Sequence, residues 1–318
     1  MIFKLPALAN IQETAMTSYF FKGQPKPIHW QTWQHFLETD LLSRGEIEIA
    51  NPLMGFELKT NGYNPHNALL LVKASQLAYL EPETIKTRIS EWNLPNFHFF
   101  NRRNTQAYIA GNEKVMVIAF RGTEPGNLRD WMNNSNILMK PGYGGHVHAG
   151  FHQALEDIWA DIATQIGLFN YNNQAIFLTG HSLGGSLAKM TAVRLPSRYQ
   201  DLIQGIYSFG SPRVGNQQFA DNYNQKFRDR TFRMINHRDI VTRLAPRSFG
   251  YRHVNSSYFF DSQGILHTEI RYWRQFLETV KGTREEFINA ASFVKDHDLR
   301  EYEKNVLLDL NGYLAKNG

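Results

Sequence analysis

The sequence contains no cysteine among its 318 residues, so disulfides, cysteine nucleophiles and thiolate metal sites are excluded. It also has no apolar run near the roughly 18 residues that a membrane-spanning helix requires. The longest useful run, Val115–Phe120, has the length of a strand. The first residues differ from a signal peptide, because Lys4 and Pro6 interrupt their apolar part and Glu13 follows it. We therefore expect a soluble protein that is cytoplasmic or peripheral to a membrane.

The composition favours a globular protein with a core, since 42% of the residues are apolar and 20% are charged. The net charge is +5, and arginines are frequent between Lys226 and Arg252. Such a basic segment attracts anionic lipid headgroups, although a solvated face with acidic partners such as Asp229 is the more ordinary interpretation. No nucleic-acid-binding module accompanies the charge, so we expect no nucleic-acid partner.

The chain divides into two regions of different character. Residues 1–65 are rich in turn-forming segments, and we interpret them as an N-terminal extension packed on the core. Over residues 66–318, strand-like runs alternate with helical patterns, which predicts an α/β fold with a mostly parallel sheet and helices on both faces. The expected strands include Val115–Phe120, Ala175–Thr179, Gly205–Phe209 and Thr231–Asn236, and the expected helices include Phe151–Ile166 and Ser186–Arg194.

The strongest chemical signal is Gly180-His-Ser-Leu-Gly184, which follows an apolar strand and precedes a helix. A nucleophilic serine needs a tight turn that raises its hydroxyl above the strand end, and glycines at both flanks avoid clashes with the neighbouring backbone. The pattern therefore indicates Ser182 as the nucleophile of a serine hydrolase. The amide of Leu183 then lies at a helix N-terminus, where it stabilises an oxyanion.

A serine hydroxyl needs a base to remove its proton, and in this fold the acid follows the serine and precedes the histidine. Asp239 comes directly after the expected strand Thr231–Asn236, where a loop acid belongs. A turn-capping or arginine-paired role is the alternative for Asp239. Asp221 and Asp261 are then the fallback acids.

Three histidines follow the acid. His297 lies in a polar stretch before an expected helix, whereas His253 follows an aromatic residue and precedes a strand-like run. Local chemistry therefore favours His297 as the base over His253 and His267.

A second oxyanion donor is expected after an early strand. Val115–Phe120 ends in Arg121-Gly-Thr123, and Gly122 lets the backbone turn so that the amide of Thr123 faces Ser182. A plain strand-ending turn is the alternative interpretation.

Together these segments resemble the class 3 lipase family, the fungal-lipase-like branch of the α/β hydrolases. The resemblance covers roughly Asn67 to Tyr302 and rests on Phe120-Arg-Gly-Thr123, Val147-His-Ala-Gly-Phe151, Gly180-His-Ser-Leu-Gly-Gly185, Ser208-Phe-Gly-Ser-Pro-Arg-Val-Gly215 and Asp239-Ile-Val241. It implies the α/β-hydrolase fold, a catalytic triad of Ser182, Asp239 and His297, and an oxyanion hole formed by the amides of Thr123 and Leu183. It also supports His297, because a late histidine in the family is followed closely by an aromatic residue.

The resemblance further implies a lid at about residues 124–145. This segment contains Trp131, Ile137, Leu138 and Met139 and has glycines at its flanks. A helix that rolls open on lipid fits this composition, as does a rigid amphipathic helix that closes part of the pocket permanently. Relatives often carry an acidic residue near Asn134, so the means of holding the Thr123 hydroxyl differs here.

His146, His148 and His152 are spaced like metal ligands, but no acidic ligand stands beside them and they fall within the lipase pattern. We therefore expect neither a metal nor a cofactor. The expected reaction is two-step acyl transfer from a lipid ester, such as an acylglycerol, phospholipid or galactolipid, to water. An esterase for soluble short-chain or aryl esters and an inactive membrane-binding relative are the alternatives.

Overall fold

The computed structural model describes residues 55–59, 62–123, 138–255, 257–268 and 295–317. Backbone contacts divide the chain into two compact units, Met1–Gly45 and Glu46–Gly318, and all described residues belong to the second. Most of the expected N-terminal extension, together with Trp131 and Ile137 of the expected lid, lies outside the described residues. Near the end of that extension, Phe56 packs its ring 4.7 Å from that of Phe177.

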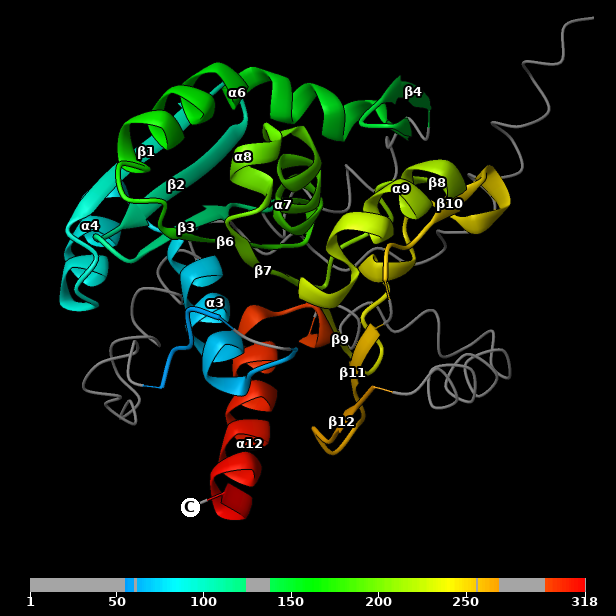
Figure 1. Cartoon of the computed structure of the whole chain (residues 1–318). Helices are drawn as coiled ribbons and strands as arrows, with labels where there is room; N and C mark the ends of the chain where they lie inside the picture. The colour runs from blue at the N-terminus through cyan, green and yellow to red at the C-terminus, as the bar shows by residue number, and fades with distance from the viewer. Residues whose placement is uncertain (1–54, 60–61, 124–137, 256, 269–294, 318) are drawn as a thin grey trace, which may run out of the picture. The chain divides into compact units, whose positions relative to one another are not determined.

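The second unit is built on an eight-stranded sheet with the order β1-β2-β3-β6-β7-β9-β11-β12 (Figure 1). Five neighbouring strands run parallel to one another, and the remaining three are antiparallel strands at the two sides. The strands are β1 Asn96–Arg102, β2 Thr105–Gly111, β3 Val115–Phe120, β6 Ala175–His181, β7 Ile203–Phe209, β9 Thr231–Asn236, β11 Ser257–Phe260 and β12 Leu266–His267. The mostly parallel sheet expected from the sequence is confirmed.

Strand β3 shows why these segments form a central sheet. All six of its side chains are buried, as expected for a parallel strand covered on both faces. Its side chains alternate between two clusters, because Ile118 packs in one and Val117 in the other. The core therefore consists of two apolar layers, one on each face of the sheet.

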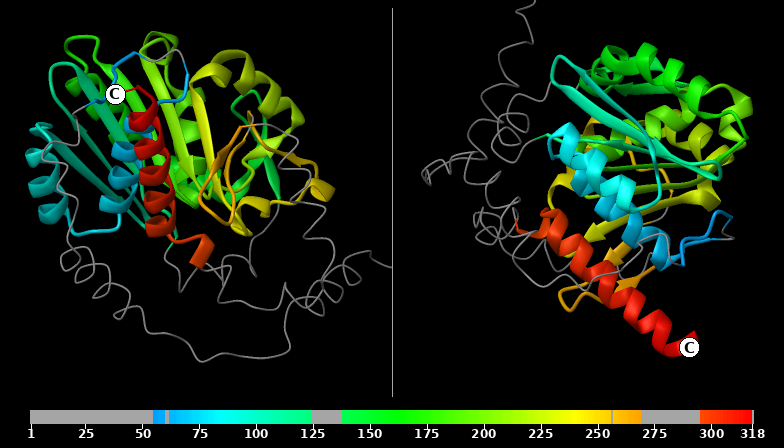
Figure 2. Two further views of the ribbon diagram at one scale, coloured as in Figure 1. Left: turned by 90° about the horizontal axis from the view of Figure 1, so that it is seen from below. Right: turned by 90° about the vertical axis from the view of Figure 1, so that its left-hand side faces the viewer.

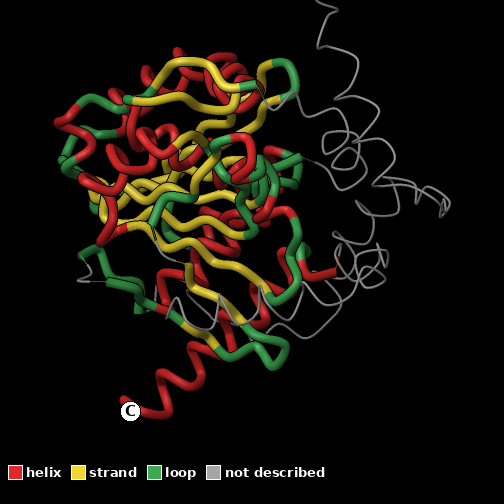
Figure 3. Tube along the Cα trace, turned by 90° about the vertical axis from the view of Figure 1, so that its right-hand side faces the viewer, coloured by secondary structure: helices red, strands yellow, loops and turns green. Residues whose placement is uncertain are grey.

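Helices cover both faces of the sheet, as Figures 2 and 3 show. One layer takes up side chains of α3 Pro65–Leu77, α4 Pro82–Glu91 and α12 Leu299–Asn317, and α12 lies beside α3. The other layer takes up side chains of α6 Ala149–Phe169, α7 Leu183–Arg194, the short α8 Ser197–Gln200 and α9 Gln217–Phe227. The described residues also include single turns of 3-10 helix at η1 Arg228–Arg230, η2 Val241–Arg243 and η3 Arg247–Phe249. None of the helices in the described ranges is long and apolar enough to cross a membrane.

A smaller antiparallel sheet has the order β10-β8-β5-β4. Its strands are β4 Met139–Gly142, β5 Gly145–His148, β8 Gly215–Asn216 and β10 Tyr251–Arg252. The expected lid of residues 124–145 therefore ends in a hairpin. The prediction of a lid helix that includes Met139 is wrong, because Met139 begins strand β4. The sequence Pro141-Gly-Tyr-Gly-Gly145 favours this outcome, because proline and glycine are poor inside a helix and common in a tight hairpin.

Candidate active site

Ser182 occupies a sharp turn between β6 and α7. Its φ of 55° and ψ of −126° lie in a region that L-residues rarely adopt, and its side chain is nearly inaccessible, with 1% exposure. A Cβ atom on Gly180 would collide with the carbonyl group of Gly184, and one on Gly184 would collide with the carbonyl oxygen of Phe120. The two flanking glycines are therefore required for the close packing that holds Ser182 in this conformation.

The end of β3 lies directly against this turn. A Cβ atom on Gly122 would be 2.6 Å from the carbonyl oxygen of His181 and 3.0 Å from Cβ of Ser182. Gly122 therefore lets the main chain leading to Thr123 approach the serine. The amide of Leu183 stands at the first position of α7, where an amide has no partner within the helix.

His297 and Asp239 are joined by a buried hydrogen bond. Nδ1 of His297 is 2.9 Å from Oδ2 of Asp239, and the two residues are 6% and 2% exposed. Because a carboxylate only accepts hydrogen bonds, Nδ1 carries a proton, and in the neutral form of the ring Nε2 then has the lone pair. Nε2 is buried and has no hydrogen-bond partner among the described residues. The arrangement thus orients the ring so that Nε2 is the nitrogen able to accept a proton.

Asp239 receives two further hydrogen bonds. The hydroxyl of Tyr302 donates to Oδ2 at 2.6 Å, and the amide of Val241 donates to Oδ1 at 2.9 Å. The Tyr302 hydroxyl in turn accepts a hydrogen bond from the amide of Asn236 at 3.0 Å. These contacts hold the carboxylate against His297.

Gly210 brings the Asp239–His297 pair to the serine. The carbonyl oxygen of Phe209 accepts a 2.9 Å hydrogen bond from the amide of Ser182. The next residue, Gly210, has a φ of +62°, and a Cβ atom there would be 2.6 Å from Oδ2 of Asp239 and 2.8 Å from Nδ1 of His297. One two-residue segment therefore contacts both the serine turn and the acid–base pair.

His181 makes a second connection, through the main chain of the base. Its Nε2 is 2.7 Å from the carbonyl oxygen of His297, and its Nδ1 is 2.8 Å from the hydroxyl of Tyr79. A carbonyl oxygen only accepts, so Nε2 of His181 donates and Nδ1 accepts from Tyr79. Burial, and then the nearby charge of His297, hold the pKa of His181 well below its ordinary value, so the ring stays neutral.

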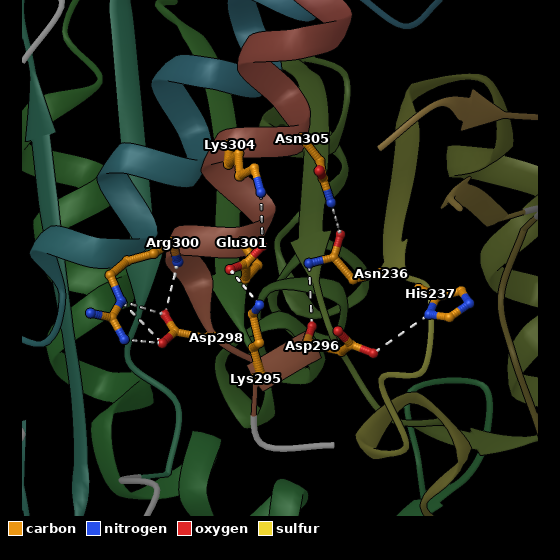
Figure 4. Close-up of polar contacts among 9 residues, drawn as sticks. All are labelled: Asn236, His237, Lys295, Asp296, Asp298, Arg300, Glu301, Lys304 and Asn305. Carbon is orange, nitrogen blue, oxygen red and sulfur yellow. Dashed lines mark hydrogen bonds and ion pairs between the residues drawn. The ribbon is translucent and has the colours of Figure 1, made fainter. Parts of the chain in front are cut away.

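The loops that carry the acid and the base are tied together by polar contacts (Figure 4). Nδ2 of Asn236 donates to the carbonyl oxygen of Asp296 at 3.2 Å, and Oδ1 of Asn236 accepts from Asn305 at 3.0 Å. His237 lies 3.8 Å from the carboxylate of Asp296 (Figure 4). The amide of Arg238 donates to the same carboxylate at 3.0 Å. The position of Asp239 is therefore coupled to that of His297 by the residues around both.

The alternative acids and bases lie in other surroundings. His267 pairs with Asp261 at 2.8 Å where β11 turns into β12. Asp221 is exposed and accepts a hydrogen bond from Gln217 on its own helix. His253 is surrounded by cationic side chains, and burial followed by those charges holds its pKa well below the usual range. The structure brings none of these into contact with Asp239 or His297 within the described ranges.

Of the histidines in and after β5, His148 and His152 make side-chain contacts within the fold. Nδ1 of His148 accepts hydrogen bonds from the amides of Gly150 and Phe151 and so caps α6, and burial lowers its pKa to about 4. His152 lies 3.8 Å from Glu156. The part of the chain that the structure describes contains no group of three or more potential metal-binding side chains.

Tyr79 and His181 were not singled out from the sequence as site residues. Tyr79 lies just beyond the end of α3, more than one hundred residues before the serine, and no local pattern marks it. Leu138 and Met139 of the expected lid lie at the start of the hairpin, and Leu138 is 61% exposed.

A serine on a strand–turn–helix, an aspartate-bound histidine and a mostly parallel sheet define the α/β-hydrolase class. A family model described as Lipase (class 3) matches residues 117–249, so this part of the chain is similar to the class 3 lipase family.

Named relatives are similar to parts of the chain. It is 36% identical over 162 residues to secreted mono- and diacylglycerol lipase 1 of Fusarium solani, covering 49% of this chain and 47% of that protein. It is 33% identical over 166 residues to a lipase of Rhizomucor miehei, covering 49% and 45% respectively. A solved triacylglycerol lipase described as having a serine protease triad matches with a TM-score of 0.51 and 27% identity, over 61% of this chain and 79% of that one. The chain thus spans about half the length of the curated relatives it matches.

Proposed function

We propose that the chain is a serine lipase that hydrolyses carboxylic esters of lipids through an acyl-enzyme on Ser182. The observation that carries the proposal is the buried hydrogen bond between Asp239 and His297, next to a serine held on a strained turn. Such a pair turns a poorly reactive hydroxyl into a nucleophile. Relatives named as mono- and diacylglycerol lipases support acylglycerols as the substrate class.

In the proposed mechanism, Nε2 of His297 accepts the proton of Ser182 as the serine oxygen attacks the ester carbonyl. Asp239 keeps the protonated Nδ1 directed inward and stabilises the imidazolium that forms. The amides of Thr123 and Leu183 donate to the developing oxyanion. His297 then gives its proton to the leaving alcohol, and a water activated by the same imidazole releases the fatty acid.

We further propose that the enzyme works at a lipid surface. Leu138 at the start of the hairpin is 61% exposed, and Phe249 in η3 is 42% exposed. Tyr251, two residues after Phe249, donates a 3.5 Å hydrogen bond to the carbonyl oxygen of Leu138, so these segments are neighbours. Arg247 precedes Phe249 and is exposed, a combination suited to contact with a lipid headgroup layer.

The test compares hydrolysis of emulsified long-chain acylglycerols with hydrolysis of dissolved short-chain esters. Wild-type enzyme is expected to act faster on the emulsion, and Ser182→Ala is expected to reduce both rates by about 10⁶-fold, as in other serine triads. A faster rate on dissolved esters would assign the enzyme to soluble substrates. Undiminished hydrolysis by a folded Ser182→Ala variant would refute the serine mechanism.

A further inference from the structure

Two cationic side chains are buried beneath the serine turn, between α7 and the sheet. Lys189 of α7 is 1% exposed and Arg233 of β9 is 4% exposed. No carboxylate lies within 4.0 Å of either one in the described part of the chain. Buried charges in proteins are nearly always paired, so this cluster lacks its counter-charge.

Serine hydroxyls surround the two cations. Nζ of Lys189 donates to Oγ of Ser211 at 2.8 Å, and Oγ of Ser186 lies 3.1 Å from this Ser211 oxygen. Ser208 lies opposite Arg233 in the register of β7 and β9, so the two side chains share one face of the sheet. These three serines have no exposed surface, which makes the cluster an enclosed site.

Several donors of this cluster remain unused. Nε of Arg233 donates to the carbonyl oxygen of Val254 at 3.2 Å, but its Nη1 is buried with no hydrogen-bond partner. Oγ of Ser208 is likewise unpartnered, as is Nε of the neighbouring Arg213. An arginine has only donors to offer, so a group that satisfies Nη1 must be an acceptor.

The surrounding charges point to the sign of the missing group. Burial and the charge of Arg233 hold the pKa of Lys189 well below its ordinary value. Burial and the charge of Arg213 lower the pKa of Arg233 to about 9. Each positive charge is thus disfavoured first by burial and then by the neighbouring cation, and a negative charge beside them would stabilise both.

We propose that this cluster binds one small monovalent anion of the halide class, held by Arg233, Lys189 and the hydroxyl of Ser208. The ligand must be small, because the enclosing serines leave no exposed opening. It lies behind the reacting groups, since Ser211 directly follows Gly210, which packs on Asp239 and His297. The anion therefore stabilises the packing of α7 against the sheet and takes no part in acyl transfer.

The first test measures thermal unfolding of the full chain as chloride replaces gluconate at constant ionic strength. General screening is equal for the two salts, so a difference between them reports specific binding. The melting temperature is expected to rise with chloride and to saturate. Lys189→Met is expected to raise the half-saturating chloride concentration at least about tenfold, because a charged donor is removed. Arg102→Met is the matched control, since Arg102 pairs with Asp161 at the surface, and its chloride response should equal that of wild type.

The second test needs no variant and so does not depend on the folding of Lys189→Met. Crystals of the full chain in sodium bromide are measured at the bromine absorption edge. An anomalous peak within hydrogen-bond reach of Nη1 of Arg233 supports the proposal. Ordered water in that place without an anomalous signal would overturn it, as would a chloride response that is unsaturable and identical in Ser208→Ala and wild type. Neither test measures ester hydrolysis, so their outcome is independent of the proposed function.

Discussion

The hydroxyl of Tyr302 donates a hydrogen bond to the same carboxylate oxygen of Asp239 that accepts the hydrogen bond of His297. Tyr302 lies on α12, five residues after His297, so one short segment supplies both the base and a support for the acid. The geometry of the acid–base pair therefore depends on how α12 packs against the sheet.

Removal of this phenol hydroxyl tests its contribution. Tyr302→Phe leaves the ring in the core but takes one donor from Asp239. We expect turnover to fall about tenfold, equivalent to ~1.4 kcal/mol, because the carboxylate orients His297 less well. Steady-state kinetics measure the effect. Tyr313→Phe is the control, since Tyr313 lies on the same helix with 40% exposure and should leave turnover unchanged. Equal kinetics in the two variants would show that Tyr302 has only a packing role.

A methyl group on Gly210 would press directly on the acid–base pair. Gly210→Ala places a Cβ atom against Asp239 and His297 and forces alanine into a positive φ. We expect a loss of activity of about 100-fold from displacement of the base. Gly312→Ala is the matched control, because nothing lies within 4 Å of its added methyl group. That helical substitution should keep full activity and raise the free energy of unfolding by about 0.5–1 kcal/mol. Full activity in Gly210→Ala would contradict the described geometry.

The contact between His181 and the carbonyl oxygen of His297 predicts an effect on turnover rather than on substrate binding. His181→Ala removes the donor to that carbonyl and the acceptor of the Tyr79 hydroxyl. We expect kcat to fall about 10- to 100-fold with KM nearly constant. His181→Asn retains a side-chain donor and should recover part of the rate. A rise in KM with unchanged kcat would instead mean that His181 contacts the substrate.

Histidine titration predicts loss of stability in acid. Burial lowers the pKa of His148 to about 4, against an unfolded value of about 6.5. The unfolded chain therefore binds a proton first as the pH falls below about 6.5, and stability decreases down to about pH 4. This single residue accounts for a loss of about 3 kcal/mol over that range. His148→Asn keeps an acceptor for the amides of α6, so its unfolding free energy should fall less between pH 7 and pH 5 than that of wild type. If the unfolding free energies of the two proteins changed equally with pH, His148 would not be the source of the loss of stability.

The central part of the fold follows from the sequence, because apolar runs such as β3 are buried on both faces and leave little choice of structure. The turn at Ser182 could also be predicted, since Gly180 and Gly184 are demanded by local sterics. By contrast, the hairpin of β4 and β5 could not be predicted, because its first strand lies in a short segment that resembles a lid. Its pairing depends on β8, which lies about seventy residues later in the chain.

The residues around the candidate site were harder to predict from the sequence. Chain order was enough to nominate Asp239 and His297, and the structure brings these two together. Tyr79 reaches the site only through the packing of α3 beside β6, and no short-range signal indicates that contact. The burial of Lys189 and Arg233 without a counter-charge could not be predicted from the sequence either, because burial of a charge is a property of the tertiary structure.

The central claim is that His297 activates Ser182, and covalent labelling tests it most directly. The full-length enzyme is treated with a fluorophosphonate, and the modified residue and labelling rate are determined by peptide mass spectrometry. We predict a single adduct on Ser182, formed at least about 10³-fold more slowly in His297→Ala, because the hydroxyl then lacks its base. Absence of an adduct on Ser182 in the folded protein, or a labelling rate that is unchanged in His297→Ala, would contradict the account.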